Sequence, residues 1–289
     1  MLRFPFNRIF SESYSPLRKI LLILSVMKRI HGRNIFIVSL AKVLQPIGPA
    51  LFLERATASH FSALWIRVGR GEGMDQNLAL PELAGLRRAL KDAGVDLWGW
   101  HVSFCANPAA ARREAEFALQ WVERHELDGL VLDLEKTPDN PRFQGGPREA
   151  EIYAGLLAEG LAAKGRGIAL STHDQPSLHP DAPLETALRI VEDVTPQVYY
   201  RSGAVARRFK KSLRDYEALI GKEAIKRRYK PTGNITTQDN MRLHSPAASL
   251  AATRNFLHLV RKTGCGAYSF WCWDAAPGEI WDFLRREPV

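Results

Sequence analysis

Residues 127–135 read Leu-Asp-Gly-Leu-Val-Leu-Asp-Leu-Glu, and this stretch decides the fold. Side chains alternate between the two faces of a β-strand, so the leucines at 130, 132 and 134 share one face. Val131, Asp133 and Glu135 share the other. An apolar outer face, with two carboxylates at the carboxyl end of the inner face, is typical of one strand in an α/β barrel, whose active site lies where the strands end. Paired carboxylates in such a place indicate acid/base chemistry on a sugar bond.

The rest of the chain repeats this pattern of elements. Runs rich in apolar, β-branched or aromatic residues occur at 34–40, 63–68, 95–101, 128–135, 167–172, 193–200, 226–231 and 266–273. Helically spaced apolar residues lie between them, as in Leu83-Leu86-Leu90. Eight strands that alternate with helices predict a single-domain α/β protein, a (β/α)₈ TIM barrel, over a doubly wound open sheet. We expect the barrel to occupy residues 33–289 and a basic extension to occupy residues 1–32.

Composition and charge exclude several classes of protein. No apolar run approaches the roughly 20 residues that a membrane-spanning helix needs. The three cysteines form neither a disulfide framework nor a zinc-like spacing. The net charge of +9 is concentrated in residues 1–33 (+6) and 201–230 (+8), which leaves −5 for the remainder. A basic tail and one basic segment argue against a nucleic-acid groove across the domain.

Residues 1–32 have no clear signal peptide, because charged residues follow the apolar run 20–27 where small residues would be needed. Three interpretations stay open: a basic amphipathic segment that makes peripheral contact with a membrane surface, a degenerate export signal, or a disordered or spurious extension. Without such a signal the default expectation is a cytoplasmic protein, with membrane association or export as alternatives. The sequence does not predict an oligomeric state.

Polar and aromatic side chains gather at the predicted strand ends, and these are the candidate site residues. Asp133, Glu135 and Tyr199 are the catalytic candidates. The candidates for substrate binding are Arg67, Trp100, His101, His173, Asp174, Gln197, Lys230, Trp271, Trp273 and Asp274. Flat indole faces at strand ends suit the apolar face of a sugar ring, and clefts are commonly lined by aromatics with a few polar groups.

The stretch 127–135 resembles the strand-four signature of glycoside hydrolase family 18, the chitinase family, whose pattern is D-G-x-D-x-D-x-E. Asp128, Gly129, Asp133 and Glu135 match it, whereas Val131 stands at the middle Asp.

Two further matches lie in later strands. Residues 197–199 resemble the Q-x-Y of the plant-type branch, and Trp271 or Trp273 fits the tryptophan expected at the end of strand eight. Family 25 lysozyme-like barrels are more distantly similar. They carry D-x-E on strand four, but they use an Asp on strand one that this chain lacks.

The resemblance implies a mechanism that requires no metal or cofactor. Glu135 would protonate the leaving glycosidic oxygen. Asp133 would hold the 2-acetamido group of the substrate and stabilise the cyclic cation formed when that group attacks the anomeric carbon, a substrate-assisted exception to the two-carboxylate scheme. Tyr199 would hold the acetamide carbonyl, and Gln197 would help to position it.

The resemblance implies that the middle Asp of the pattern would lie buried beneath Asp133 and help to set its charge state, and Val131 removes that partner. Catalysis would then be slower, shifted in its pH optimum, or dependent on another base such as Asp174 or Asp274. A base roughly 6.5–9.5 Å from Glu135 would give inversion instead. The sequence does not choose between these outcomes.

Three other interpretations compete with a catalytic pair. The two carboxylates could form structural ion pairs with Arg67, Arg70 or Lys230. They could belong to a metal-dependent or phosphate-handling barrel. They could also belong to a non-catalytic barrel that binds glycans or another protein. We expect a glycoside hydrolase that acts on a polymer containing N-acetylhexosamine, either chitin-like or peptidoglycan, because the acid position keeps its Glu.

Overall fold

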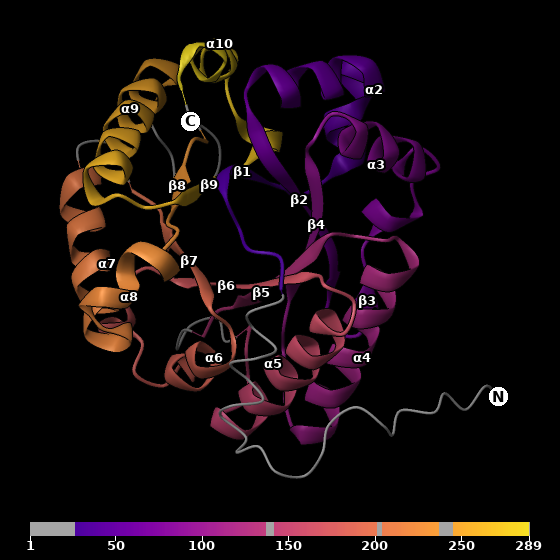
Figure 1. Cartoon of the computed structure of the whole chain (residues 1–289), viewed down its shortest axis with the longest axis vertical. Helices are drawn as coiled ribbons and strands as arrows, with labels where there is room; N and C mark the ends of the chain where they lie inside the picture. The colour runs from indigo at the N-terminus through magenta and orange to yellow at the C-terminus, as the bar shows by residue number, and fades with distance from the viewer. Residues whose placement is uncertain (1–26, 137–141, 201–203, 237–244, 289) are drawn as a thin grey trace.

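The computed structural model describes residues 27–136, 142–200, 204–236 and 245–288. Its parallel strands are β1 (Gly32–Ile37), β2 (Phe61–Arg70), β4 (Asp96–Val102), β5 (Gly129–Leu134), β6 (Gly167–His173), β7 (Asp193–Val198), β8 (Thr232–Asn234) and β9 (Ala267–Trp271). Each strand pairs with the next, and β1 pairs with both β2 and β9, so the sheet closes into a barrel (Figure 1). A short antiparallel strand, β3 (Gly73–Met74), extends β2.

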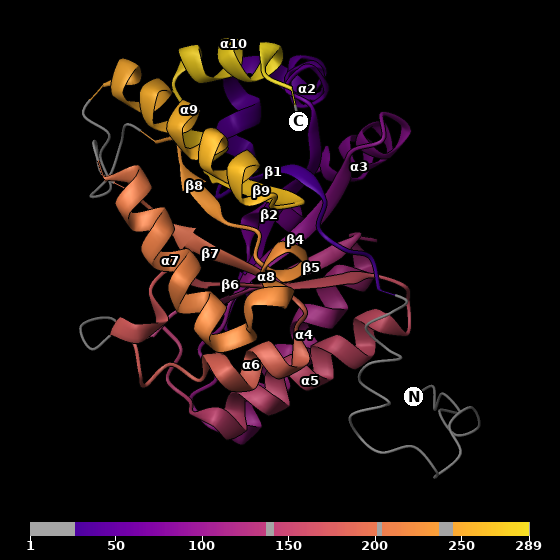
Figure 2. The ribbon, with the colours of Figure 1, turned by 60° about the vertical axis from the view of Figure 1, so that its left-hand side comes forward.

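Helices form the outer layer around this barrel, as Figure 2 shows from the side. They are α2 (Leu40–Ala58), α3 (Leu83–Asp92), α4 (Pro108–Arg124), α5 (Pro147–Ala162), α6 (Leu184–Ile190), α7 (Val205–Ile220), α8 (Lys222–Arg228), α9 (Pro246–Thr263) and α10 (Gly278–Arg286). Proline stands in the first turn of α4, α5 and α9, where its missing N–H costs nothing. The predicted (β/α)₈ barrel is confirmed.

The pleat of β5 divides its residues between two cores. Leu130, Leu132 and Leu134 belong to the large core between the strands and the helices. Val131 belongs to a smaller core inside the barrel, which also contains Trp65, Trp98 and Trp100. The alternation in residues 127–135 therefore places the side chains as the sequence predicts, with Asp133 and Glu135 above the inner core.

Two glycines in neighbouring strands make room for the indole of Trp98. A Cβ at Gly129 would lie 2.5 Å from Trp98 Cε3, and one at Gly167 would lie 2.1 Å from Trp98 Cη2. Trp98 is 1% exposed and fills the lower barrel. The glycine of the 127–135 motif thus has a packing role, since no larger residue fits beside this indole.

We expect Gly167→Ala to lower the free energy of unfolding by about 1–3 kcal/mol, the usual cost of overpacking a core. The new methyl group would also meet Lys28 O at 2.6 Å, so backbone as well as indole must move. Chemical denaturation measures the loss. Gly155→Ala in α5 is the control: nothing lies within 4 Å of its Cβ position, so the protein should be equally or more stable. Equal stability of the Gly167→Ala variant would contradict the packing role.

The prediction of a strand at 226–231 is wrong. Residues 222–228 form α8, and the seventh barrel strand is β8, only three residues long. Its sequence, Thr-Gly-Asn, contains no apolar run, because its inner face carries hydroxyl and amide groups: Thr232 Oγ1 lies 2.7 Å from Ser269 Oγ of β9. The first strand also ends earlier than predicted, at Ile37, where Ser39 caps α2.

Residues 27–31 pack across the amino-terminal end of the barrel. Ile30 is 3% exposed and belongs to the inner core. Lys28 Nζ forms ion pairs with Asp96, where β4 begins, and with Asp128, just before β5. This segment therefore joins the bottoms of several strands.

Among the described residues, none of the helices has the length and apolar character needed to cross a membrane.

Candidate active site

Asp133 and Glu135 lie at the carboxyl end of β5, at the mouth of the barrel. Asp133 is next to Ser171 of β6 in the strand register and is 4% exposed. Glu135 follows the strand, and its side chain is 20% exposed. One carboxyl group is therefore buried at the base of the mouth, while the other reaches solvent.

Gln197 of β7 joins the two carboxyl groups. Its Nε2 lies 2.9 Å from Asp133 Oδ1, 2.7 Å from Glu135 Oε1 and 3.2 Å from Ser171 Oγ. The amide donates to both acids and so fixes their separation. This junction of β5, β6 and β7 brings together three residues that are far apart in the sequence.

Burial raises the pKa of Asp133 well above its usual range, and the neighbouring Glu135 raises it further. The Arg142 guanidinium opposes this effect. Two carboxyl groups this close cannot both ionise easily, so Asp133 retains its proton to a higher pH than an isolated aspartic acid would. A retained proton is what a general acid must supply.

Tyr199 and Trp271 place aromatic surface beside the carboxyl pair. Burial raises the pKa of Tyr199, and the nearby Glu135 and Asp133 raise it further, so its hydroxyl remains a hydrogen-bond donor. Its ring centroid lies 6.0 Å from that of Trp271, which in turn lies 5.8 Å from Trp100. Trp100 is buried and donates from Nε1 to Ile37 O at 3.1 Å. Trp271 and Tyr199 are both partly exposed.

Arg67 and Asp274 support the opposite rim of the mouth. Arg67 forms an ion pair with Asp75, and its guanidinium lies 5.6 Å from the ring centroid of Trp100. Asp274 accepts hydrogen bonds from Val38 N at 2.8 Å and Ser39 N at 2.7 Å, which ties the end of β9 to the end of β1. Burial raises the pKa of Asp274.

His173 and Asp174 follow β6 and contact other protein groups. His173 Nε2 lies 2.9 Å from Lys136 N, next to Glu135 in the chain, and its ring stacks on His179 with centroids 3.7 Å apart. Asp174 is paired with Arg208 of α7. The charge of Asp174 is thus balanced by an arginine. His173 accepts a hydrogen bond from the backbone N–H of Lys136, the residue after Glu135.

His101 and Trp273 are not brought together with the carboxyl pair. His101 is fully buried against the helices, with Nδ1 2.6 Å from Tyr153 Oη and Nε2 2.8 Å from Gly71 O, and burial lowers its pKa to about 4. The pleat explains this position, because Trp100 points inward and the next residue must point outward. Trp273 packs on Phe52 in the outer core.

Lys230, which the sequence predicts at the mouth, lies at the other end of the barrel and is not brought together with the carboxyl pair. Its Nζ is 2.6 Å from Ile30 O and 3.1 Å from Asp193 Oδ1, at the start of β7. The error follows from the strand error, since a residue two positions before β8 is at the bottom of the barrel. Asp193 also pairs with Arg29.

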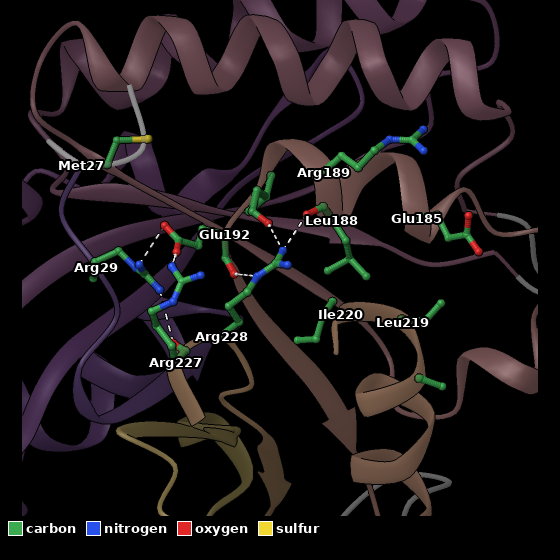
Figure 3. Close-up of a pocket in the computed structure, with 12 residues that line it drawn as sticks. Met27, Arg29, Glu185, Leu188, Arg189, Glu192, Leu219, Ile220, Arg227 and Arg228 are labelled. Atoms are coloured by element: carbon green, nitrogen blue, oxygen red, sulfur yellow. Dashed lines mark hydrogen bonds and ion pairs between the residues drawn. The ribbon is translucent and has the colours of Figure 1, made fainter. Parts of the chain in front are cut away.

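A groove of about 750 Å³ lies near this bottom network rather than at the carboxyl pair. Figure 3 shows Arg29 and Arg227 on either side of Glu192, with Leu188, Leu219 and Ile220 along the wall. Arg228 donates to the backbone oxygens of residues 188, 191 and 192. Arg29, Arg227 and Arg228 therefore all have protein partners in this groove.

We expect Lys230→Met to destabilise the protein by about 3 kcal/mol, because removing one member of a buried ion pair leaves Asp193 with less compensation. Thermal unfolding measures this loss. Glycan binding by the folded variant should be unchanged, since the residue is remote from the mouth. A selective loss of binding with normal stability would restore the original prediction.

Ser171 and Arg142 are site residues that sequence reasoning missed. Ser171 shares the inner face of its strand with Ala169, so the period-two pattern could have identified it. Arg142 Nη1 lies 3.2 Å from Glu135 Oε2 and 3.7 Å from Asp133 Oδ2. It comes from the segment between β5 and α5, and no pattern in the sequence indicates that position. Within the described residues, no group of three His, Cys, Asp or Glu side chains is arranged to hold a metal ion.

Comparison with known proteins gives structural relatives only. No protein-family model and no curated protein matches the sequence. A GH18 chitinase from Pseudoalteromonas aurantia is similar in structure, with a TM-score of 0.59 at 12% identity over 86% of this chain and 97% of that one. The Bacillus cereus spore cortex-lytic enzyme SleL gives 0.59 at 13% identity over 89% and 74%.

A third similar structure is the endo-β-N-acetylglucosaminidase of Cordyceps militaris. It was solved as a variant with Asp-to-Asn and Glu-to-Gln replacements two positions apart, in complex with fucosyl-N-acetylglucosamine-Asn. It gives a TM-score of 0.62 at 12% identity over 96% of each chain. The closed barrel and these likenesses agree: the chain has the TIM-barrel fold of the family 18 chitinases.

Proposed function

We propose that this protein is a glycoside hydrolase that acts on a glycan containing N-acetylhexosamine, with Glu135 as the general acid. The observation that carries the proposal is the Asp133–Glu135 pair, bridged by Gln197 at the open end of the barrel. The pair has one buried and one partly exposed carboxyl group. Burial and the neighbouring Glu135 raise the pKa of Asp133, and Glu135 is the partly exposed member of the pair that would pass a shared proton to a ligand in the mouth.

The neighbouring groups suit a substrate-assisted reaction. Glu135 gives its proton to the glycosidic oxygen as the bond to the anomeric carbon breaks, and the acetamido oxygen of the substrate forms the new bond to that carbon. Asp133 then stabilises the cationic ring. Water later attacks the anomeric carbon and gives a proton to the Glu135 carboxylate, while the bond from that carbon to the acetamido oxygen breaks. Tyr199, held protonated, is placed to donate to the acetamide carbonyl.

Neither alternative base is free. Asp174 is paired with Arg208, and Asp274 accepts two backbone N–H groups. Using either as the base of an inverting reaction would disrupt these contacts. This favours the acetamido group of the substrate as the nucleophile.

Val131 defines how this site differs from the family pattern. It is fully buried in the inner core with Trp98, Trp100 and Ala169, so apolar atoms lie beneath Asp133 where a second carboxyl group would be. Glu135 is then the acid that raises the pKa of Asp133. The proton is accordingly shared between Asp133 and Glu135 themselves.

The similar structures support the same class of substrate. They include a chitinase, a cortex-lytic enzyme and an endo-β-N-acetylglucosaminidase. In the third of these, the replaced Asp and Glu have the same spacing as Asp133 and Glu135. The partly exposed face of Trp271 beside Tyr199 offers a surface for a sugar ring.

A non-catalytic glycan-binding barrel is the second candidate. Two observations favour it: Val131 replaces an acid, and Arg142 is paired with Glu135. A screen of purified protein against chitin oligomers and peptidoglycan separates the two functions, with the Glu135→Gln variant beside it. Hydrolysis that depends on Glu135 supports the enzyme. Binding without hydrolysis supports the second candidate.

A further inference from the structure

Arg142 lies directly against the carboxyl pair, on the side away from Gln197. Gln197 donates hydrogen bonds to Asp133 Oδ1 and Glu135 Oε1. Arg142 forms ion pairs with the other two oxygens, Asp133 Oδ2 and Glu135 Oε2. Gln197 also reaches Ser171 inside the barrel, and the Arg142 side chain is 35% exposed. The Arg142 side chain is therefore more exposed to solvent than either of the two acids that it contacts.

The guanidinium conflicts with general-acid catalysis as long as it stays on Glu135. Arginine is always charged and can only donate, so while Arg142 stays on Oε2 and Gln197 stays on Oε1, neither oxygen of Glu135 is free to carry a proton to a glycosidic oxygen. A general acid must hold its proton. Productive binding therefore requires another anion for Arg142.

Three other basic residues near the mouth, all within the described residues, have protein partners. Arg67 is paired with Asp75, Arg208 is paired with Asp174, and Lys136 Nζ donates to Gly145 O at 2.6 Å. Among the described residues, the acids paired with Arg142 are Asp133 and Glu135. Arg142 is thus paired with the two acids that the proposed reaction uses.

We propose that Arg142 is a specificity-determining residue that binds a carboxylate on the substrate, so the substrate class is an acidic N-acetylhexosamine glycan. This inference rests on the proposed function and narrows it. A carboxylate accepts the planar guanidinium fork through two parallel hydrogen bonds. An ether-linked carboxylate on a sugar next to the scissile bond draws the guanidinium from Glu135 and leaves that acid free to hold its proton.

The test compares two glycans that differ only in charge. Peptide-free peptidoglycan strands carry free lactyl carboxylates, and the same strands after carboxyl reduction carry neutral alcohols. We expect the wild-type protein to cleave the acidic strands with a kcat/KM at least about tenfold higher, the value of one charge-assisted pair. Arg142→Gln should bring that ratio close to one, because acidic strands lose their contact with the guanidinium and neutral strands meet a Glu135 that is no longer paired with it. Arg148→Gln, an exposed arginine in the first turn of α5, should keep the wild-type ratio.

Calorimetric binding of both strands separates this inference from the proposed function. Equal cleavage and equal binding of the two strands by the wild-type protein overturn the role of Arg142, as does an unchanged preference in Arg142→Gln. Binding that prefers the acidic strand and depends on Arg142, without cleavage of either strand, overturns the hydrolase instead and leaves the anion site standing.

Discussion

Glu135→Gln should lower kcat by about 10²–10⁴-fold, the range that general acids contribute, and should leave glycan binding nearly unchanged. Glutamine keeps the shape of the side chain, and its amide oxygen can still accept from Gln197 Nε2. It carries no proton that it can give to a leaving oxygen. Steady-state hydrolysis and calorimetric binding on the same glycan measure the two effects separately.

The dependence on the leaving group distinguishes a general acid from a merely structural glutamate. The loss should be largest for a sugar leaving group, which needs protonation, and smallest for an acidic phenol, which departs without it. Glu151→Gln, an exposed residue of α5, is the matched control and should behave like the wild-type protein. A Glu135→Gln variant that loses the same factor on every leaving group would falsify the acid assignment.

Much of the fold follows from local patterns that have a direct physical basis. Residues 130–134 alternate between the outer and inner sides of the barrel, so the orientation of Asp133 and Glu135 is fixed once the strand forms. Gln197 is aligned with His173 in the register of β6 and β7, and this places its amide above the pair. The alternation of side chains along each strand and the order of the strands are therefore enough to predict that Asp133, Glu135 and Gln197 lie together.

The remaining errors come from interactions that a single sequence does not encode. The strand Thr232–Asn234 is held by its neighbours rather than by its own apolar residues, so α8 was mistaken for it and Lys230 was assigned to the wrong end. Arg142 reaches the pair from a connecting segment, where no periodicity applies. Placing it required the tertiary structure.

The position of His101 could have been predicted better from the sequence. The sequence puts it beside Trp100, and both were candidate binding residues. Alternation sends one of them inward and the other toward α4 and α5, where Tyr153 accepts or donates a hydrogen bond. Applying the pleat to this strand as strictly as to residues 127–135 would have separated the two.

Asp133→Asn should lower kcat by about 10²–10³-fold, because a neutral amide cannot stabilise the cationic ring electrostatically. The pH profile should change as well. In the wild-type protein burial and the neighbouring Glu135 raise the pKa of Asp133. Asparagine at this position cannot bind that proton, so the alkaline limb of kcat/KM should move toward acid. Activity measured across pH on one glycan shows both changes.

The same substitution should stabilise the fold, and the direction follows from the raised pKa of Asp133. A raised pKa means that the folded protein binds this proton more tightly than the unfolded chain does, so stability falls as the pH rises from the unfolded value through the folded one. Asparagine does not ionise, so the variant does not lose stability in this way as the pH rises. The unfolding temperature of the Asp133→Asn variant should therefore exceed that of the wild-type protein at neutral pH, and the gap should shrink in acid. Lower stability at neutral pH would mean that the pair with Arg142 outweighs burial, and that Asp133 is held as an anion instead of sharing the catalytic proton.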